Sequence, residues 1–175
     1  MNTWDAVHGK RAIREFTDQA IAREDLDRIV RAGTRAHSSK NQQRWGFVVV
    51  RDRERLEALA TTGPYAGHVA GAAAAVALVT PDPRAGGQPL SVMWDLGGAA
   101  AQMMLVAWEL GIGSCPATVY EQDLVHELLG LPADRWCEYI LSFGYPADGS
   151  KLTAPLRQGG RKPVAEVVYE ERWEG

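Results

Sequence analysis

An apolar stretch that begins at about Ser91 and ends at about Leu110 constrains the fold more than any other part of this sequence. Its interior, LGGAAAQMMLVAW at positions 96–108, is typical of a helix, and Gly111 and Gly113 follow as stop signals. A helix that is apolar nearly all round must be buried nearly all round. In a chain of 175 residues, this predicts either the central helix of the core or a helix at a subunit interface.

Short hydrophobic runs and periodic patterns predict the other elements. Strands are expected at Trp45–Val50, which we interpret as buried on both faces, at 72–80 and at 139–143. Helices are expected over 24–35 and from Asp52 onward.

The stretch from Ser114 to Glu121 is expected to be a turn that connects two helices. Thr118 and Glu121 have the spacing of a capping box before a helix over 122–129, so exposed backbone N–H groups are expected here. A plain helix-to-helix connection without a binding role stays open as the alternative.

Composition limits the class of protein. With 46% hydrophobic residues and a net charge of −3, the chain reads as one globular domain over residues 1–175. Lys and Arg total 19 against 22 Asp and Glu, which argues against binding nucleic acid. The longest weakly polar stretch, Val69–Val79, is too short to span a membrane. Cys115 and Cys137 lack the spacing of a zinc site or a disulfide framework, so we expect no metal and a cytoplasmic location.

Two polar stretches could bind a ligand. The turn at 37–43, HSSKNQQ, places hydroxyl and amide groups before a strand, although such groups often bond their own backbone. The basic stretch Lys10-Arg11-Ala12-Ile13-Arg14 could clamp a phosphate, or could be a solvated cluster that a helix C-terminus favours. His68 is isolated between Tyr65 and Gly71, and a lone histidine is more often structural than catalytic.

The order of these motifs resembles the FMN-dependent nitroreductase family over nearly the whole chain. The resemblance rests on the basic stretch, S-S-x-N-x-Q-x-W at 38–45, the D-x-G helix that ends in G-x-G, G-Y-P at 144–146 and R-K-P at 161–163. It implies an α+β fold, a sandwich in which helices flank a mostly antiparallel sheet, built as an intertwined homodimer with FMN at the subunit interface.

The same resemblance implies a set of FMN-binding residues and no catalytic side chain. The phosphate would be held by Lys10, Arg11, Arg14 and Arg161, with Ala12 in place of the family's usual serine. The partner subunit would contribute the turn residues His37, Ser38, Ser39 and Asn41 to the same FMN. The backbone of Pro116, Ala117, Thr118 and Val119 would lie against the flavin ring, with Val119 where relatives often have glycine.

The implied activity is a ping-pong oxidoreductase in which NAD(P)H reduces FMN and a small nitroaromatic, quinone-like or related acceptor reoxidises it. The flavin would supply the chemistry. A short loop at 84–90, where relatives often carry a lid, favours an open site. Trp94 and Tyr120 could close over the flavin, although a packed core position is the favoured interpretation for both. A specialised dehalogenase or desaturase, and a flavin-binding dimer without turnover, remain as alternatives.

Overall fold

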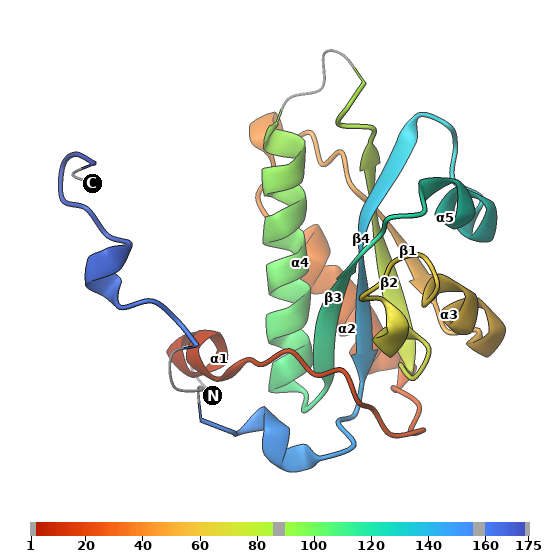
Figure 1. The fold of residues 1–175 in the computed structure, drawn as a ribbon, viewed down its shortest axis with the longest axis horizontal. Coiled ribbons are helices and arrows are strands. Elements are labelled where there is room, and N and C mark those ends of the chain that lie inside the picture. The colour runs from red at the N-terminus through yellow and green to blue at the C-terminus, as the bar shows by residue number, and fades with distance from the viewer. Residues whose placement is uncertain (1–2, 86–89, 156–159, 174–175) are drawn as a thin grey trace.

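A four-stranded antiparallel sheet forms the centre of the computed structural model, which describes residues 3–85, 90–155 and 160–173 (Figure 1). The strand order is β1-β2-β4-β3. The strands are β1 (Gly46–Val50), β2 (Ala74–Pro81), β3 (Gly113–Thr118) and β4 (Arg135–Gly144).

Helices cover both faces of this sheet (Figure 1). On one face lie α2 (Arg23–Thr34) and α4 (Ser91–Glu109), and on the other lie α3 (Arg53–Leu59) and α5 (Gln122–Leu129). The short α1 (Thr3–Gly9) packs on α4, and single 3-10 turns occur at η1 (Ser39–Asn41), η2 (Gly67–Val69), η3 (Gly149–Leu152) and η4 (Val164–Glu166). The α+β class with a mostly antiparallel, helix-flanked sheet is therefore confirmed.

Strand β2 divides the interior into two apolar cores. Its side chains are buried from Ala74 to Thr80, and they alternate between the faces as the pleat requires. Val76 and Leu78 face α2 and α4, while Ala75 and Ala77 face α3 and α5. The small side chains predicted for this strand let helices pack closely on both sides.

Strand β1 differs from the expectation of a strand buried on both faces. It forms one end of the sheet and pairs only with β2, so Val49 is 41% exposed in a groove beside α2. A run of β-branched residues thus predicted the strand correctly but not its place in the sheet. The helix predicted after it is confirmed, because Asp52 caps α3 by accepting a bond from the Arg55 N–H at 3.0 Å.

The expected turn at 114–121 is wrong, because most of this stretch is strand β3. It pairs with β4 along the other end of the sheet, where Pro116 is tolerated because one side of an edge strand needs no donor. The capping box does not form either, since Glu121 is the N-cap of α5 and makes no side-chain capping bond. The N–H of Val119 bonds to the carbonyl of Glu138.

The basic stretch of the N-terminal segment runs along the outer edge of β3. The Ile13 N–H donates to the Ser114 carbonyl at 3.0 Å, within a parallel bridge between Ala12 and Ser114. Gly113 makes this approach possible, because a Cβ there would lie 2.6 Å from the Cβ of Ile13. The bridge therefore fixes the basic residues relative to β3.

Two apolar surfaces are left uncovered by the residues that the structure describes. Helix α4 buries one side, including Leu96 and Met103, but leaves Gly97 and Ala101 exposed. The segment 160–173 extends away from the body of the molecule and exposes Val164 and Trp173 (Figure 1). Among the described residues, no helix is both long enough and apolar enough to cross a membrane.

The contact between Gly113 and Ile13 gives a stability prediction. Gly113→Ala should lower the free energy of unfolding by about 1–3 kcal/mol, because the new methyl group overpacks a closed contact. Urea denaturation measures this value. Gly71→Ala is the matched control, since nothing lies within 4 Å of its added Cβ, and it should change stability by less than about 0.5 kcal/mol. Equal effects of the two variants would contradict the close packing of the N-terminal segment on β3.

Candidate functional site

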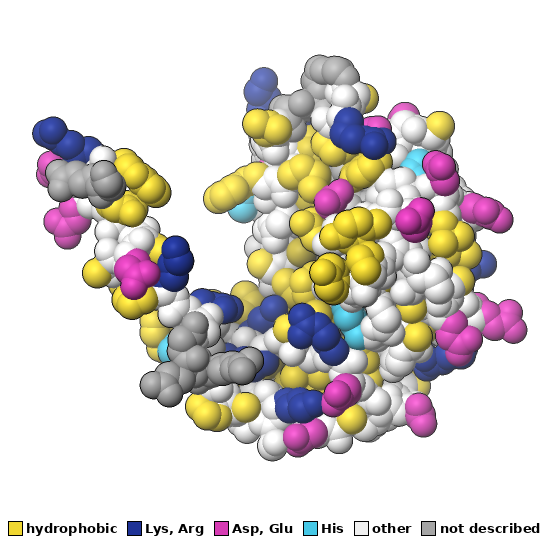
Figure 2. Space-filling model, viewed as in Figure 1, with side chains coloured by type: hydrophobic (Ala, Val, Ile, Leu, Met, Phe, Trp, Pro, Cys, Tyr) yellow, Lys and Arg dark blue, Asp and Glu magenta, His cyan; other side chains and the backbone are white. Residues whose placement is uncertain are grey.

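A pocket lined by cations lies where the N-terminal segment meets the C-terminal part of the chain. Its volume is about 490 Å³, and Lys10, Arg11, Ala12, Lys151 and Arg161 contribute to its wall. Figure 2 shows Lys and Arg side chains gathered around α1 and the adjoining end of β3. We call this cavity the basic pocket.

Lys10 carries a charge that forms no ion pair with a described acid. Partial burial lowers the pKa of the Lys10 ammonium, the Cys115 thiol opposes this shift, and the nearby Arg161 guanidinium lowers the pKa further. Within residues 3–85, 90–155 and 160–173, no ion pair joins Lys10 or Arg161 to an acid. Half-buried positive charge without an acidic partner is suited to binding an anion.

Arg11 is used mainly to cap α1. One terminal nitrogen donates to the carbonyls of His8 and Gly9, both at 2.7 Å, and the other donates to the carbonyl of Ala154 at 3.1 Å. These bonds match the alternative interpretation of the basic stretch, in which a cation is favoured at the C-terminal end of a helix. The Arg11 Nε is buried, and no described residue accepts a hydrogen bond from it.

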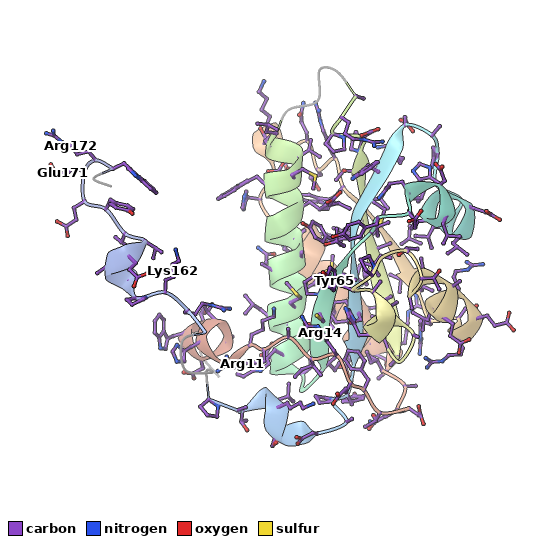
Figure 3. The ribbon with its side chains drawn as sticks, in the orientation of Figure 1. Arg11, Arg14, Tyr65, Lys162, Glu171 and Arg172 are labelled. Atoms are coloured by element: carbon purple, nitrogen blue, oxygen red, sulfur yellow. The ribbon has the colours of Figure 1, made fainter. Side chains whose placement is uncertain are left out.

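Arg14 lies along β3 rather than in the wall of the basic pocket. Figure 3 places Arg14 next to β3, while Arg11 lies at the end of α1. Arg14 is exposed and acts electrostatically on both Cys115 and His68. The structure therefore brings Lys10, Arg11, Ala12 and Arg161 together and sets Arg14 farther along the same edge.

A second cavity of about 250 Å³ lies between α4 and the sheet, and it is mostly apolar. The sheet contributes Pro116 and Tyr139, and the helix contributes Met93, Gly97 and Met104. Figure 2 shows hydrophobic side chains in this strip between α4 and β4. We call it the apolar pocket. Its helix residues were not among the predicted site residues, although their three- and four-residue spacing would have placed them on one face.

Strand β3 connects the two pockets. Ala12 of the basic pocket pairs with Ser114, and Pro116 of the apolar pocket follows two residues later on the same strand. At a rise of about 3.3 Å per residue, the strand from Ser114 to Thr118 spans about 13 Å. A ligand with an anionic end and a flat apolar end would match this arrangement.

The turn at 37–43 is fixed to the N-terminal end of α4. The Ser39 N–H donates to Asp95 Oδ2 at 2.9 Å, and Trp94 Nε1 donates to His37 Nε2 at 2.7 Å. Asp95 is only 7% exposed, so this carboxylate is a buried anchor. Trp94 itself is 72% exposed and Tyr120 is also exposed, so the expectation that both pack in the core is wrong.

Polar groups within the turn partly bond to one another, as the alternative interpretation held. Ser38 Oγ accepts from the Gln43 N–H at 3.1 Å, and Asn41 Oδ1 accepts from Gln43 Nε2 at 3.0 Å. Lys40, Asn41 and Gln43 have positive φ angles of 52°, 55° and 46°. Such clustered strain persists only where the surroundings hold it, and it often marks a functional segment.

The turn and the basic pocket lie at opposite ends of α4. Gly9, before the pocket, packs against the Trp108 ring near the end of the helix, whereas the turn is anchored at Trp94 and Asp95. At about 1.5 Å per residue, these two contact points are about 20 Å apart. The structure thus does not bring His37, Ser38, Ser39 and Asn41 together with Lys10 and Arg161 within one chain. Among the described residues, no group of three or more His, Cys, Asp or Glu side chains could hold a metal.

Comparisons with known proteins agree on one family. The profile of the nitroreductase family matches residues 7–63 and 61–145. A protein of Archaeoglobus fulgidus, provisionally named NADH dehydrogenase/NAD(P)H nitroreductase, is 35% identical over 81% of this chain and 84% of its own length. The FMN reductase (NADPH) of Bacillus subtilis is 28% identical over 97% of this chain and 73% of its own. The crystal structure of Vibrio harveyi NADPH:FMN oxidoreductase with NAD⁺ has a TM-score of 0.84 at 26% identity, and the match covers 100% of this chain and 79% of that one.

Proposed function

Because the chain belongs to the nitroreductase family, we propose that it forms one FMN-binding domain that reduces small acceptors with NAD(P)H by a ping-pong mechanism. It is an NAD(P)H-dependent oxidoreductase with FMN as its cofactor. The observation that carries the proposal for this site is the pair of pockets along β3, one cationic and one apolar. We propose nitroaromatic, quinone-like or related molecules as acceptors, and the cytoplasm as the compartment, where the buried thiols Cys115 and Cys137 would stay reduced.

The basic pocket suits the phosphate of FMN. Lys10 and Arg161 offer positive charge that no described acid pairs with. Arg14 extends the positive charge along β3 toward the ribityl chain. The methyl group of Ala12 offers no hydroxyl, so the cations provide most of the binding here.

The apolar pocket and the outer edge of β3 suit the flavin ring. Within Pro116–Val119, Pro116 has no N–H, and the Val119 N–H is already bonded to Glu138. Alternation along an antiparallel strand turns the Ala117 N–H toward β4 and the Thr118 N–H away from it. Thr118 is therefore the backbone donor of this stretch that we assign to the ring. When bound, FMN supplies the hydride-transfer chemistry, and the chain supplies binding and orientation.

We further propose a symmetric homodimer in which the turn at 37–41 serves the FMN of the partner subunit. The separation of about 20 Å along α4 supports this arrangement, because the turn is far from the basic pocket of its own chain. The exposed side of α4 and the extended segment 160–173 offer apolar surface to a second copy.

The decisive experiment is the visible absorption spectrum of the purified protein, followed by addition of NAD(P)H without oxygen. We expect flavin bands that bleach on addition and return when a quinone or a nitroaromatic compound is added. Bands that never bleach would favour the alternative of a flavin-binding dimer without turnover. Halide release or substrate desaturation would favour a specialised relative.

The prediction of an open site rests on the short loop at 84–90. Residues 86–89 of this loop lie outside the described residues.

Lys10→Met should weaken FMN binding by about 10- to 100-fold, because it removes a charge-assisted contact worth about 1.5–3 kcal/mol. Fluorescence titration of apoprotein with FMN measures this affinity. Because the pKa of Lys10 is lowered, its charge is lost at a lower pH than that of an ordinary lysine. The affinity of the parent protein should therefore fall as the pH rises through the alkaline range, and that of Lys10→Met should fall less.

Lys162→Met is the matched control for this substitution. Lys162 is exposed on the extended C-terminal segment, away from β3 (Figure 3). The FMN affinity of the Lys162→Met variant should equal that of the parent protein. Equal losses in both variants would indicate a general charge effect and would contradict the assignment of Lys10.

Deleting residues 164–175 should convert the dimer to monomer and weaken FMN binding, while Arg161 and Lys162 remain in the chain. Light scattering coupled to gel filtration gives the oligomeric state, and FMN titration gives the affinity. The variant Val164→Ala, which trims one exposed side chain, controls for mild changes in the segment. A folded monomer with full FMN affinity would contradict the shared site.

A further inference from the structure

We propose that His68 is a positioning residue that, together with Ser142, holds the backbone of β3 at Cys115 and Pro116 for contact with the flavin. This inference rests on the proposed function, since it assigns a role toward the ring-binding stretch. Sequence reasoning favoured a structural role for this histidine, and the structure shows which backbone groups it serves.

The contacts run from η2 through β4 to β3. His68 Nδ1 lies 2.9 Å from Ser142 Oγ, and Ser142 Oγ donates to the Cys115 carbonyl at 3.2 Å. Ser142 is fully buried, so these two bonds are shielded from water. The Pro116 carbonyl also faces the imidazole ring. Through Ser142, His68 therefore acts on the Cys115 carbonyl, which directly precedes the stretch assigned to the ring.

The hydrogen-bond partners of Ser142 assign a tautomer to the neutral ring. Ser142 has one hydroxyl hydrogen, and it is directed to the Cys115 carbonyl. The short contact to His68 Nδ1 then requires that Nδ1 carries the proton and donates to Ser142 Oγ. His68 Nε2 is then an acceptor, and it is buried with no hydrogen-bond partner among the described residues.

The surroundings keep this ring neutral. Burial lowers the pKa of His68, and the neighbouring Arg14 guanidinium lowers it further, while the Pro116 carbonyl acts in the opposite direction. A neutral ring donates one hydrogen bond, to Ser142, so this chain of side-chain bonds adds to the pairing of β3 with β4 in holding the Cys115 peptide. Thr118 follows three residues later on the same strand, so a shift of β3 at Cys115 would also turn the Thr118 N–H.

The test compares His68→Leu, Ser142→Ala and the double variant, each loaded with FMN. Either single substitution should weaken FMN binding by about two- to tenfold, the effect of one hydrogen bond. Each should also make the midpoint potential of the flavin more negative, because a misdirected N–H stabilises the reduced flavin less. Since both residues act through one chain of bonds, the double variant should be no worse than the single ones.

His68→Asn is the conservative variant, because its side-chain amide can donate to Ser142 Oγ from about the position of Nδ1. It should restore the flavin potential and affinity to near those of the parent protein. His126→Asn, at a half-buried position of α5, is the matched control and should change neither value. Unchanged potentials in His68→Leu and Ser142→Ala, or effects that add fully in the double variant, would overturn the proposal.

A flavin-free measurement separates this proposal from the proposed function. ¹⁵N NMR of the apoprotein should show His68 as a neutral ring protonated at Nδ1, with the signal assigned by its loss in His68→Asn. A ring protonated at Nε2 would overturn the bond chain even if the protein binds FMN. A protein that shows the expected tautomer but takes up no flavin would instead contradict the proposed function.

Discussion

The hydrogen bond between the Ile13 N–H and the Ser114 carbonyl is the interaction on which the rest of the site depends. It closes the outer edge of β3 at one end and leaves the other end open. The cationic residues that precede Ile13 are thereby held beside the strand that continues into Pro116 and Thr118. One strand therefore sets the distance between the charged and apolar parts of the site, and no loop has to be ordered to bring them together.

Helix α4 has a second organising role. Its buried side closes the core above β2 and β4, its middle forms one wall of the apolar pocket, and its two ends hold different segments. The turn anchored by Asp95 and the contact of Gly9 with Trp108 are separated by most of the helix. A helix of this length keeps the two segments about 20 Å apart within one chain, which is the structural reason for invoking a second subunit.

Sequence reasoning succeeded where local pattern and tertiary structure agree. The long apolar helix, the Asp52 cap and the buried strand β2 have strong local signals, and all three are present. It failed for β3, because Gly113, Ser114 and Pro116 favour turns, and the strand exists only through pairing with β4. The position of β1 in the sheet and the bonds of Arg11 and His68 also depend on contacts between distant segments, which periodicity does not encode. The order of motifs identified the family, but the geometry of the site required the fold.

Helix α1 is short, and none of its described residues is buried. It is held by the carbonyl bonds of Arg11 and by the contact of Gly9 with Trp108. Segments with so little burial open by local fluctuation at a free energy far below that of global unfolding. Amide hydrogens of α1 therefore exchange with solvent long before those of β2 or β4. Each such opening loosens one wall of the basic pocket, which gives a bound ligand a route of escape that leaves the sheet intact.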